Sequence, residues 1–221
     1  MKVVILMAGI GSRLGNPFPK CLTPLKDGCT ILDHQLANLR EFAGNIIGVV
    51  GFKKDLVMEK HPELIFIYNP RYDQTNTSKS LLAALEHVEN EDVLWLNGDV
   101  VFDKRIPPAL FESKSSGMAV VTSKVSDEEI KFTVDERGHI NAVSKSVTNA
   151  LGEAVGINLV RAADLPVFRE SLRECADNDY FEKGLELSIA RGMKLLPVDV
   201  TAYPCIEVDF QADLNAARQI V

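Results

Sequence analysis

The feature that most constrains the fold is an uninterrupted apolar run near the amino end, from Val3 to Ala8. A strand with no polar residue on either face is buried on both faces, which is typical of parallel sheets covered by helices. Similar short runs follow at residues 45–51, 64–69 and 92–99. The sequence therefore predicts a largely buried sheet with the first strand at its centre.

Helical periodicity appears between these runs. Apolar residues spaced three and four apart follow Thr30, whose hydroxyl can cap a helix that Gly44 can end. A second pattern of this kind begins after Thr77 or Ser78, and either residue can be its cap. Alternating strands and helices of this size predict an α/β fold with a mostly parallel sheet and right-handed crossovers.

Beyond about residue 115 the pattern changes to that of antiparallel strands. The expected strands cover 117–125, 130–144 with a turn at 135–138, and 152–160. Helices at about 164–175 and 180–191, strands at 194–200 and 204–209, and a helix from about Phe210 complete the expected order. With 221 residues, the chain is long enough for one well-buried core and short for two.

Composition excludes several classes of function. A net charge of −7 argues against a general nucleic-acid surface, which needs many cations. The four cysteines form no C-x-x-C pair and lack surrounding histidines, so neither zinc nor a redox pair is indicated. No stretch reaches the roughly 20 apolar residues needed to cross a bilayer. We expect a cytoplasmic protein with free thiols and no membrane insertion.

The loop after the first run, "LMAGIGSRLGNPFPK" at residues 6–20, concentrates glycine, proline and two cations. It is not a dinucleotide fingerprint, because Leu14 stands where the third glycine would be, and no G-K-S/T follows as in a P-loop. Glycines let backbone amides approach a phosphate chain, and Arg13 and Lys20 can clamp it from two sides. A surface loop with solvated cations fits the same residues.

Further segments in the same order resemble a known family. The loop is similar to the L-x-A-G-x-G-x-R-L…P-K motif of the nucleotidyltransferase superfamily, with Met7 as a mild departure. Through "YNPRYDQTNTSKSLLAAL", "NGDVVF", "GEAVGINLV" and "IEVDFQADL", nearly the whole chain resembles CTP:phosphocholine cytidylyltransferase and its bacterial relatives. The resemblance implies a single-domain Rossmann-like (GT-A type) α/β fold over residues 1–221, with helices on both faces and a small antiparallel acceptor-side extension. About 1–115 would bind the nucleotide and about 116–221 the acceptor.

Two acids stand where a magnesium ion could bind. Asp99 follows a predicted central strand, at the sheet edge where α/β folds hold ligands, and Asp209 ends the segment "IEVD". Taken alone, Asp99 could be a turn or cap residue, and Asp209 could cap the final helix. In the similar family, aspartates at these two places share the metal, which implies that Asp99 and Asp209 bind Mg²⁺.

The resemblance also implies a direct displacement, in which an acceptor phosphate oxygen attacks the α-phosphorus of an NTP and pyrophosphate leaves. Arg13 would hold the β- and γ-phosphates, Lys20 would bridge the α-phosphate and the acceptor phosphate, and both would be catalytic together with Asp99 and Asp209. For Asn76 a plain helix N-terminus is the alternative interpretation, as it is for Ser80. The expected nucleotide-binding residues are Leu6, Ala8, Gly9, Gly11, Ser12, Arg13, Lys20, Asn76, Ser80 and Asp99.

The resemblance implies less about the acceptor side of the site than about the nucleotide side. The expected acceptor-binding residues are Lys145, Glu153, Tyr180, Glu182 and Glu207. Carboxylates and aromatic faces suit an amine or a quaternary ammonium. Solvent exposure is the alternative for Lys145, and a capping box with Asp179 is the alternative for Glu182. Asn158 follows Gly156-Ile157 where choline-specific relatives carry an aromatic residue, which counts against an aromatic cage for choline.

These observations predict a Mg²⁺-dependent nucleotidyltransferase of the EC 2.7.7 class, a cytidylyltransferase. Its expected partners are an NTP, CTP on the resemblance, and a small phosphorylated or phosphonylated alcohol: phosphocholine, phosphoethanolamine, an aminoalkylphosphonate or a polyol phosphate. A homodimer is left open. The alternatives are a sugar-1-phosphate nucleotidyltransferase and a catalytically silent nucleotide-sensing domain of the same fold.

Overall fold

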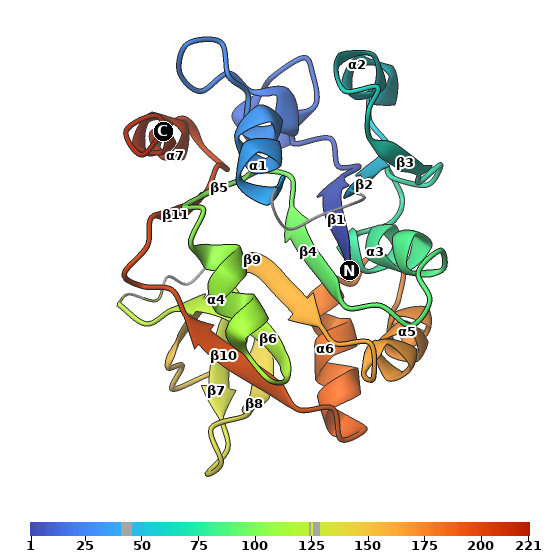
Figure 1. The fold of residues 1–221 in the computed structure, drawn as a ribbon, viewed down its shortest axis with the longest axis vertical. Coiled ribbons are helices and arrows are strands. Elements are labelled where there is room, and N and C mark those ends of the chain that lie inside the picture. The colour runs from blue at the N-terminus through green and yellow to red at the C-terminus, as the bar shows by residue number, and fades with distance from the viewer. Residues whose placement is uncertain (41–45, 124, 126–128) are drawn as a thin grey trace.

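The computed structural model describes residues 1–40, 46–123, 125 and 129–221 and forms an α/β fold (Figure 1). The strands are β1 (Lys2–Met7), β2 (Ile46–Val50), β3 (Ile65–Tyr68), β4 (Val93–Asn97), β5 (Val100–Phe102), β6 (Ser116–Val121), β7 (Lys131–Val134), β8 (Ile140–Ser144), β9 (Gly152–Val160), β10 (Leu195–Asp199) and β11 (Cys205–Glu207). The helices are α1 (Ile31–Leu39), α2 (Lys54–Lys60), α3 (Thr77–Leu85), α4 (Ile106–Glu112), α5 (Leu165–Glu174), α6 (Phe181–Ala190) and α7 (Gln211–Ala217).

The first apolar run is the centre of the sheet, as predicted. The strand order is β10-β6-β9-β4-β1-β2-β3, and β1 pairs in parallel with β2 on one side and β4 on the other. The pairs β2–β3 and β6–β10 are also parallel, whereas β9 runs antiparallel to both β4 and β6. The central sheet is therefore mostly parallel. The predicted antiparallel extension is the hairpin of β7 and β8, which joins the sheet through β9.

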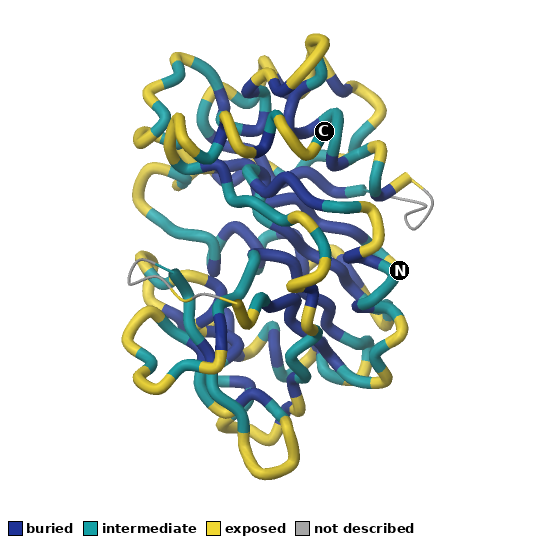
Figure 2. Tube along the Cα trace, turned by 90° about the vertical axis from the view of Figure 1, so that its left-hand side faces the viewer, coloured by how far each residue is buried: buried dark blue, intermediate teal, exposed yellow. Residues whose placement is uncertain are grey.

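Helices cover both faces of the sheet, and Figure 2 shows buried residues concentrated along the strands between them. One buried cluster joins β1 and β4 to α3, α5 and α6, and it includes Trp95, Phe168 and Phe181. The other cluster joins the opposite face to α1 and α4, and it includes Leu32 and Leu110. The two-sided burial explains why the central strands are apolar without alternation.

A smaller two-stranded sheet connects residues that are far apart in the sequence. Strand β5 pairs antiparallel with β11, and Val100 lies opposite Glu207. The backbone N–H of Val208 donates to the carbonyl of Asp99 at 3.0 Å. This pairing brings the segment after β11 to the carboxyl end of β4, which is the edge where open α/β sheets bind ligands.

Some helix boundaries differ from the predictions. Thr30 caps α1 as expected, whereas Gly44, the predicted end of that helix, lies outside the described residues. The cap of α3 is Asn76, not Thr77 or Ser78, because its side chain accepts from the N–H of Thr77. The hydroxyls of Thr77 and Ser78 instead bind backbone groups near the start of α6.

The short elements α2, α4 and β5 were not predicted. Helix α4 starts with prolines in its first turn, where a missing N–H costs little, so these residues begin the helix instead of excluding one. Helix α2 and strand β5 are too short to show a clear periodicity. None of the helices in the described part of the chain has the length and apolar character needed to cross a membrane.

Candidate active site

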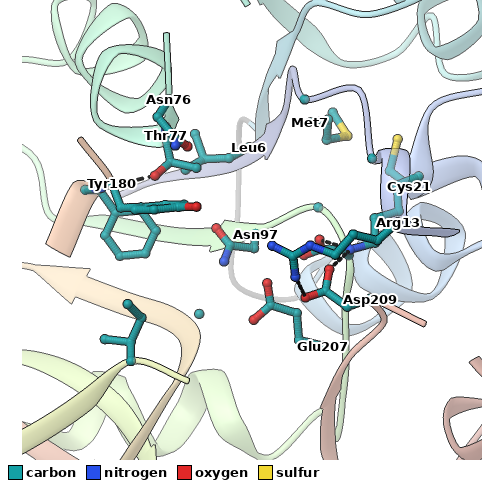
Figure 3. Close-up of a pocket in the computed structure, with 18 of the residues that line it drawn as sticks. Leu6, Met7, Arg13, Cys21, Asn76, Thr77, Asn97, Tyr180, Glu207 and Asp209 are labelled. Atoms are coloured by element: carbon teal, nitrogen blue, oxygen red, sulfur yellow. Dashed lines mark hydrogen bonds and ion pairs between the residues drawn. The ribbon is translucent and has the colours of Figure 1, made fainter. Parts of the chain in front are cut away.

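A cavity of about 930 Å³ opens at the carboxyl edge of the central sheet. Figure 3 shows Arg13, Glu207 and Asp209 on one side of it, Asn76, Thr77 and Tyr180 on the other, and Asn97 between the two groups. Its walls come from the loop after β1, the start of α3, the turn after β4, and the segments around β8, β9, α6 and β11. Both halves of the chain therefore contribute to one cavity.

The glycine-rich loop has a specific shape that requires glycine at Gly11. Gly11 has a φ of +66°, a backbone conformation that favours glycine. A Cβ added to Gly11 would lie 3.0 Å from Cβ of Lys20, so the loop closes tightly over that lysine. Two short 3₁₀ turns, Ser12–Leu14 and Lys20–Leu22, carry the two predicted cations. The loop therefore presents Arg13 and Lys20 to the same cavity.

Lys20 lies between two aspartates from distant parts of the chain. Its Nζ donates to Oδ2 of Asp99 at 2.7 Å and to Oδ1 of Asp209 at 2.5 Å. Arg13 donates to the other oxygen of Asp209. Burial disfavours the charge on Lys20, whose side chain is 12% exposed, but the two carboxylates outweigh this effect and raise its pKa. Lys20 is therefore a charged ammonium, and the solvated-loop alternative does not hold for it.

Three carboxylates form a group that could hold a metal ion. Asp99, Glu207 and Asp209 each offer an oxygen within 4.8 Å of the others. Oδ1 of Asp99 is buried and has no hydrogen-bond partner among the described residues. Burial, together with the charges of Asp99 and Asp209, raises the pKa of Glu207 well above its ordinary value. An all-carboxylate set with an unsatisfied oxygen fits a hard divalent cation such as Mg²⁺.

The opposite wall is built where α3 meets the segment before α6. The N–H of Asn76 donates to the carbonyl of Asp177 at 2.8 Å, and the N–H of Phe181 donates to Oγ1 of Thr77 at 3.0 Å. Phe181 is buried edge-on against Trp95 at a ring distance of 5.7 Å. These contacts fix the first turn of α6, so Tyr180 and Glu182 face the cavity.

Glu182 is buried at this wall, with 7% of its surface exposed. Its Oε2 has no hydrogen-bond partner among the residues that the structure describes. Burial raises the pKa of Glu182 to about 7, while its own N–H and Lys145 act in the opposite direction. Nζ of Lys145 lies 5.9 Å from the centre of the Tyr180 ring. Lys145 therefore lies on the cavity wall in contact with other site residues.

Most of the predicted site residues line this cavity. Those that do are Leu6, Gly9, Gly11, Ser12, Arg13, Lys20, Asn76, Asp99, Lys145, Tyr180, Glu182, Glu207 and Asp209.

Three predicted site residues, Ala8, Ser80 and Glu153, are not among the residues that line it. Ala8 is packed under the loop, and its carbonyl accepts from the N–H of Phe52. Ser80 lies buried inside α3, where its hydroxyl accepts from Asn69. Glu153 is in β9 next to Ala154, which does line the cavity, and its charge is one of the causes that raise the pKa of Glu129, another lining residue.

The structure also rejects two capping alternatives. Phe210, not Asp209, is the N-cap of α7, and the Asp213 carboxylate accepts from the backbone N–H of both residues. Tyr180 is the N-cap of α6 and has no side-chain cap bond. Asp179 accepts from the N–H of Ala176 instead, so Asp179 and Glu182 form no capping box. The carboxylates of Asp209 and Glu182 are therefore not committed to helix ends.

Several residues that line the cavity were not predicted from the sequence. Asn97 stands two residues before Asp99, and its buried Oδ1 has no partner in the described structure. The alternation of β4 places Asn97 on one face with Trp95, which gives no signal of a ligand site. Glu129 also lines the cavity, and burial, with Glu153 and Asp209 as further causes, raises its pKa. It lies in a segment whose polar sequence indicated only a loop.

A comparison with protein families finds that residues 3–155 match the model of the MobA-like NTP transferase domain. The bifunctional protein GlmU of Methanococcus maripaludis is 31% identical over 168 residues, which are 73% of this chain and 39% of that protein. The CMP-5'-(3-aminopropyl)phosphonate synthase of Streptomyces rubellomurinus is 29% identical over 98% of this chain and 38% of that protein. The chain thus spans about two fifths of the length of the curated relatives it matches.

Among solved structures, the inositol-1-phosphate CTP transferase from T. maritima superposes with a TM-score of 0.81 at 20% identity. The match covers 99% of this chain and 94% of that chain. At this level of identity, the comparison establishes the fold. It agrees with the Rossmann-like arrangement predicted from the sequence.

Proposed function

Because the chain belongs to the family of MobA-like NTP transferase domains, we propose that it is a transferase of the EC 2.7.7 type that moves CMP from CTP to a small phosphorylated or phosphonylated alcohol. Membership confirms the resemblance to the nucleotidyltransferase superfamily. The observation that carries the proposal is the convergence of Arg13 and Lys20 with Asp99 and Asp209 on one cavity. No protein nucleophile is needed, because phosphoryl chemistry depends mainly on alignment and charge stabilisation.

We assign the nucleotide to the walls formed by the first part of the chain. The backbone from Gly9 to Ser12 would approach the phosphates, since glycine leaves these amides uncovered. Leu6 would contact the base or ribose, and Asn76, at the start of α3, would contact the base. The acceptor would then occupy the walls formed by Lys145, Tyr180 and the acids beyond residue 115.

Asp99 and Asp209 would hold a magnesium ion, with Glu207 beside them. Among the described lining residues, six carboxylates face three cations, so a triphosphate entering this cavity needs additional positive charge. When bound, the ion would neutralise the charge that develops around the α-phosphorus. Oδ1 of Asp99 would thereby gain the partner that it lacks.

Lys20 and Arg13 would exchange carboxylates for phosphates when the nucleotide binds. Arg13 is half exposed, so its guanidinium can swing from Asp209 to the β- and γ-phosphates. Lys20 would bridge the α-phosphate and the incoming acceptor phosphate, which brings two anions together for in-line attack. The acceptor oxygen would form a bond to the α-phosphorus while the bond to pyrophosphate breaks.

The cytidylyl and acceptor assignments are supported by the relatives. A CMP-(aminopropyl)phosphonate synthase matches nearly the whole chain, and a CTP transferase for an inositol phosphate shares its fold. A sugar 1-phosphate acceptor is the second candidate, because a GlmU protein matches 73% of the chain at 31% identity. A silent nucleotide sensor is disfavoured, since nucleotide binding alone gives no reason to keep both cations and both metal-binding acids.

A pyrophosphate-release assay tests the proposal. CTP, UTP, ATP and GTP would each be combined with phosphoethanolamine, 2-aminoethylphosphonate, phosphocholine, glycerol 3-phosphate and glucose 1-phosphate in the presence of magnesium. We expect release with CTP and a phospho- or phosphono-alcohol, and none from Asp99→Asn. Release only with glucose 1-phosphate would favour the second candidate, and nucleotide binding without release in any combination would favour the sensor.

A further inference from the structure

We propose that Glu182 is a specificity-determining residue that selects an acceptor with a protonated primary amine by accepting an N–H hydrogen bond from it. This inference rests on the proposed function, in which the second part of the chain lines the acceptor side of the cavity. It narrows the acceptor to an aminoalkyl phosphate or phosphonate. It also gives a role to a carboxylate that phosphoryl transfer itself does not use.

The burial of Glu182 is the first observation. Its Oε2 is removed from solvent and accepts no hydrogen bond from any residue that the structure describes. A buried carboxylate oxygen without a donor is costly, and a ligand that donates a hydrogen bond to it would remove this cost. Glu182 lines the cavity, so a bound molecule can reach it.

Neighbouring groups do not complete Glu182. Lys145 favours its charge from a distance, while the Lys145 ammonium lies over the Tyr180 ring. The same carboxylate stands in the first turn of α6, where the helix dipole favours a negative charge. Neither effect outweighs burial, which raises the pKa of Glu182 to about 7, so the ionised carboxylate lacks a directly bound cation.

The rigidity of the wall supports recognition of a ligand. Phe181, the preceding residue, is held by Thr77 and packs on Trp95, and Gly184 packs against Leu172 so closely that an added Cβ would lie 2.6 Å from it. The backbone that carries Glu182 is thus fixed on both sides of this residue. A preorganised carboxylate binds a ligand without a large ordering cost.

The missing partner of Oε2 has to be a hydrogen-bond donor. This requirement distinguishes the classes of acceptor from one another. A quaternary ammonium has no N–H and cannot satisfy Oε2, although its charge would be attracted. A polyol hydroxyl could donate, but it brings no positive charge to a cavity that is already lined by Glu129, Glu182 and Glu207. A primary ammonium supplies both, and charge-assisted hydrogen bonds are about twice as strong as neutral ones.

Binding measurements test this without depending on turnover. The protein, with magnesium and a non-hydrolysable CTP analogue bound, would be titrated by calorimetry with 2-aminoethylphosphonate, with propylphosphonate as the analogue of equal size that lacks the amine, and with phosphocholine and glycerol 3-phosphate. We expect 2-aminoethylphosphonate to bind roughly 30-fold or more tightly than propylphosphonate. In Glu182→Gln this ratio falls to within about threefold, while affinity for the CTP analogue is unchanged.

The control is Glu186→Gln on the same helix, whose carboxylate pairs with Lys183 outside the cavity. It should retain the wild-type preference for the amine. Equal binding of 2-aminoethylphosphonate and propylphosphonate by the wild type would overturn the inference. So would a Glu182→Gln variant that keeps the preference, or one that loses CTP binding instead.

The inference and the proposed function can fail separately. Amine-selective binding that depends on Glu182, without pyrophosphate release, would leave the inference standing and remove the transferase. Pyrophosphate release with equal use of amines and polyols would leave the transferase standing and remove the role of Glu182.

Discussion

The Lys20 ammonium donates to Oδ2 of Asp99 at 2.7 Å and joins the loop after β1 to the turn after β4. Both groups lie where we place the nucleotide and the metal ion, so the ammonium takes the position between carboxylates that a cation would use. Under the proposed function, the substrates would therefore have to open this pair. Lys20 would pass from carboxylates to phosphates when an NTP arrives.

Lys20→Met should lower the kcat/KM of pyrophosphate release roughly 100-fold or more, because the charge that brings the two phosphates together is lost. Steady-state assays with saturating acceptor measure the effect. Lys54→Met is the matched control, since that lysine pairs with Asp55 away from the cavity, and it should keep wild-type activity. A Lys20→Met enzyme within threefold of the wild type would contradict the assigned role.

Magnesium should stabilise the folded protein through the acids at the carboxyl edge. A ligand that binds only the folded state at 100 times its dissociation constant adds about 2.7 kcal/mol, which raises the Tm of a chain this long by several degrees. Asp99→Asn and Asp209→Asn should remove this rise. Thermal unfolding in magnesium and in EDTA measures it. Asp55→Asn, at an exposed site, is the control, and an undiminished rise in Asp99→Asn would show that the ion binds elsewhere.

Gly98 sets the position of Asp99. A Cβ at this residue would lie 2.7 Å from the carbonyl oxygen of Leu6, a backbone atom that cannot move aside easily. Gly98→Ala should therefore cost about 1–3 kcal/mol in the free energy of unfolding and shift the turn that carries Asp99. Urea unfolding measures this cost. Gly9→Ala, where an added Cβ meets nothing within 4 Å, should leave stability nearly unchanged, and equal losses would contradict this account.

The sequence predicts the sheet better than the positions of individual site residues. The two-sided burial of β1 follows from local composition, and so does its central place. The convergence of Lys20 with Asp209 depends on the pairing of β5 with β11, which no local pattern encodes. Only the resemblance to the nucleotidyltransferase motif predicted that Lys20 and Asp209 lie at one site.

The three predicted residues outside the cavity lining share a different cause. Ala8, Ser80 and Glu153 each lie within one to three residues of a residue that lines the cavity, so the sequence can identify a segment without giving the direction of each side chain. Strand and helix geometry turns neighbouring side chains to different faces. Conversely, the burial of Glu182 depends on the contacts between α3 and α6, which involve residues about 100 positions apart.

The buried carboxylate of Glu182 should make stability depend on pH. Burial raises its pKa from 4.5 to about 7, so the folded state binds more protons than the unfolded state between these values. Stability then falls as the pH rises through this window, and the ionised group costs up to about 3 kcal/mol above pH 7. Glu182→Gln removes this cost, so the variant should be more stable than the wild type at pH 8 and similar to it near pH 4.5. Urea unfolding of both proteins across this range measures the difference, with Glu186→Gln as the control that should follow the wild type.

A constant difference between wild type and Glu182→Gln at all pH values would show that the carboxylate is not held in its neutral form. A stability gain in the variant that loses amine selectivity would indicate that the folded protein keeps this carboxylate for binding and not for stability.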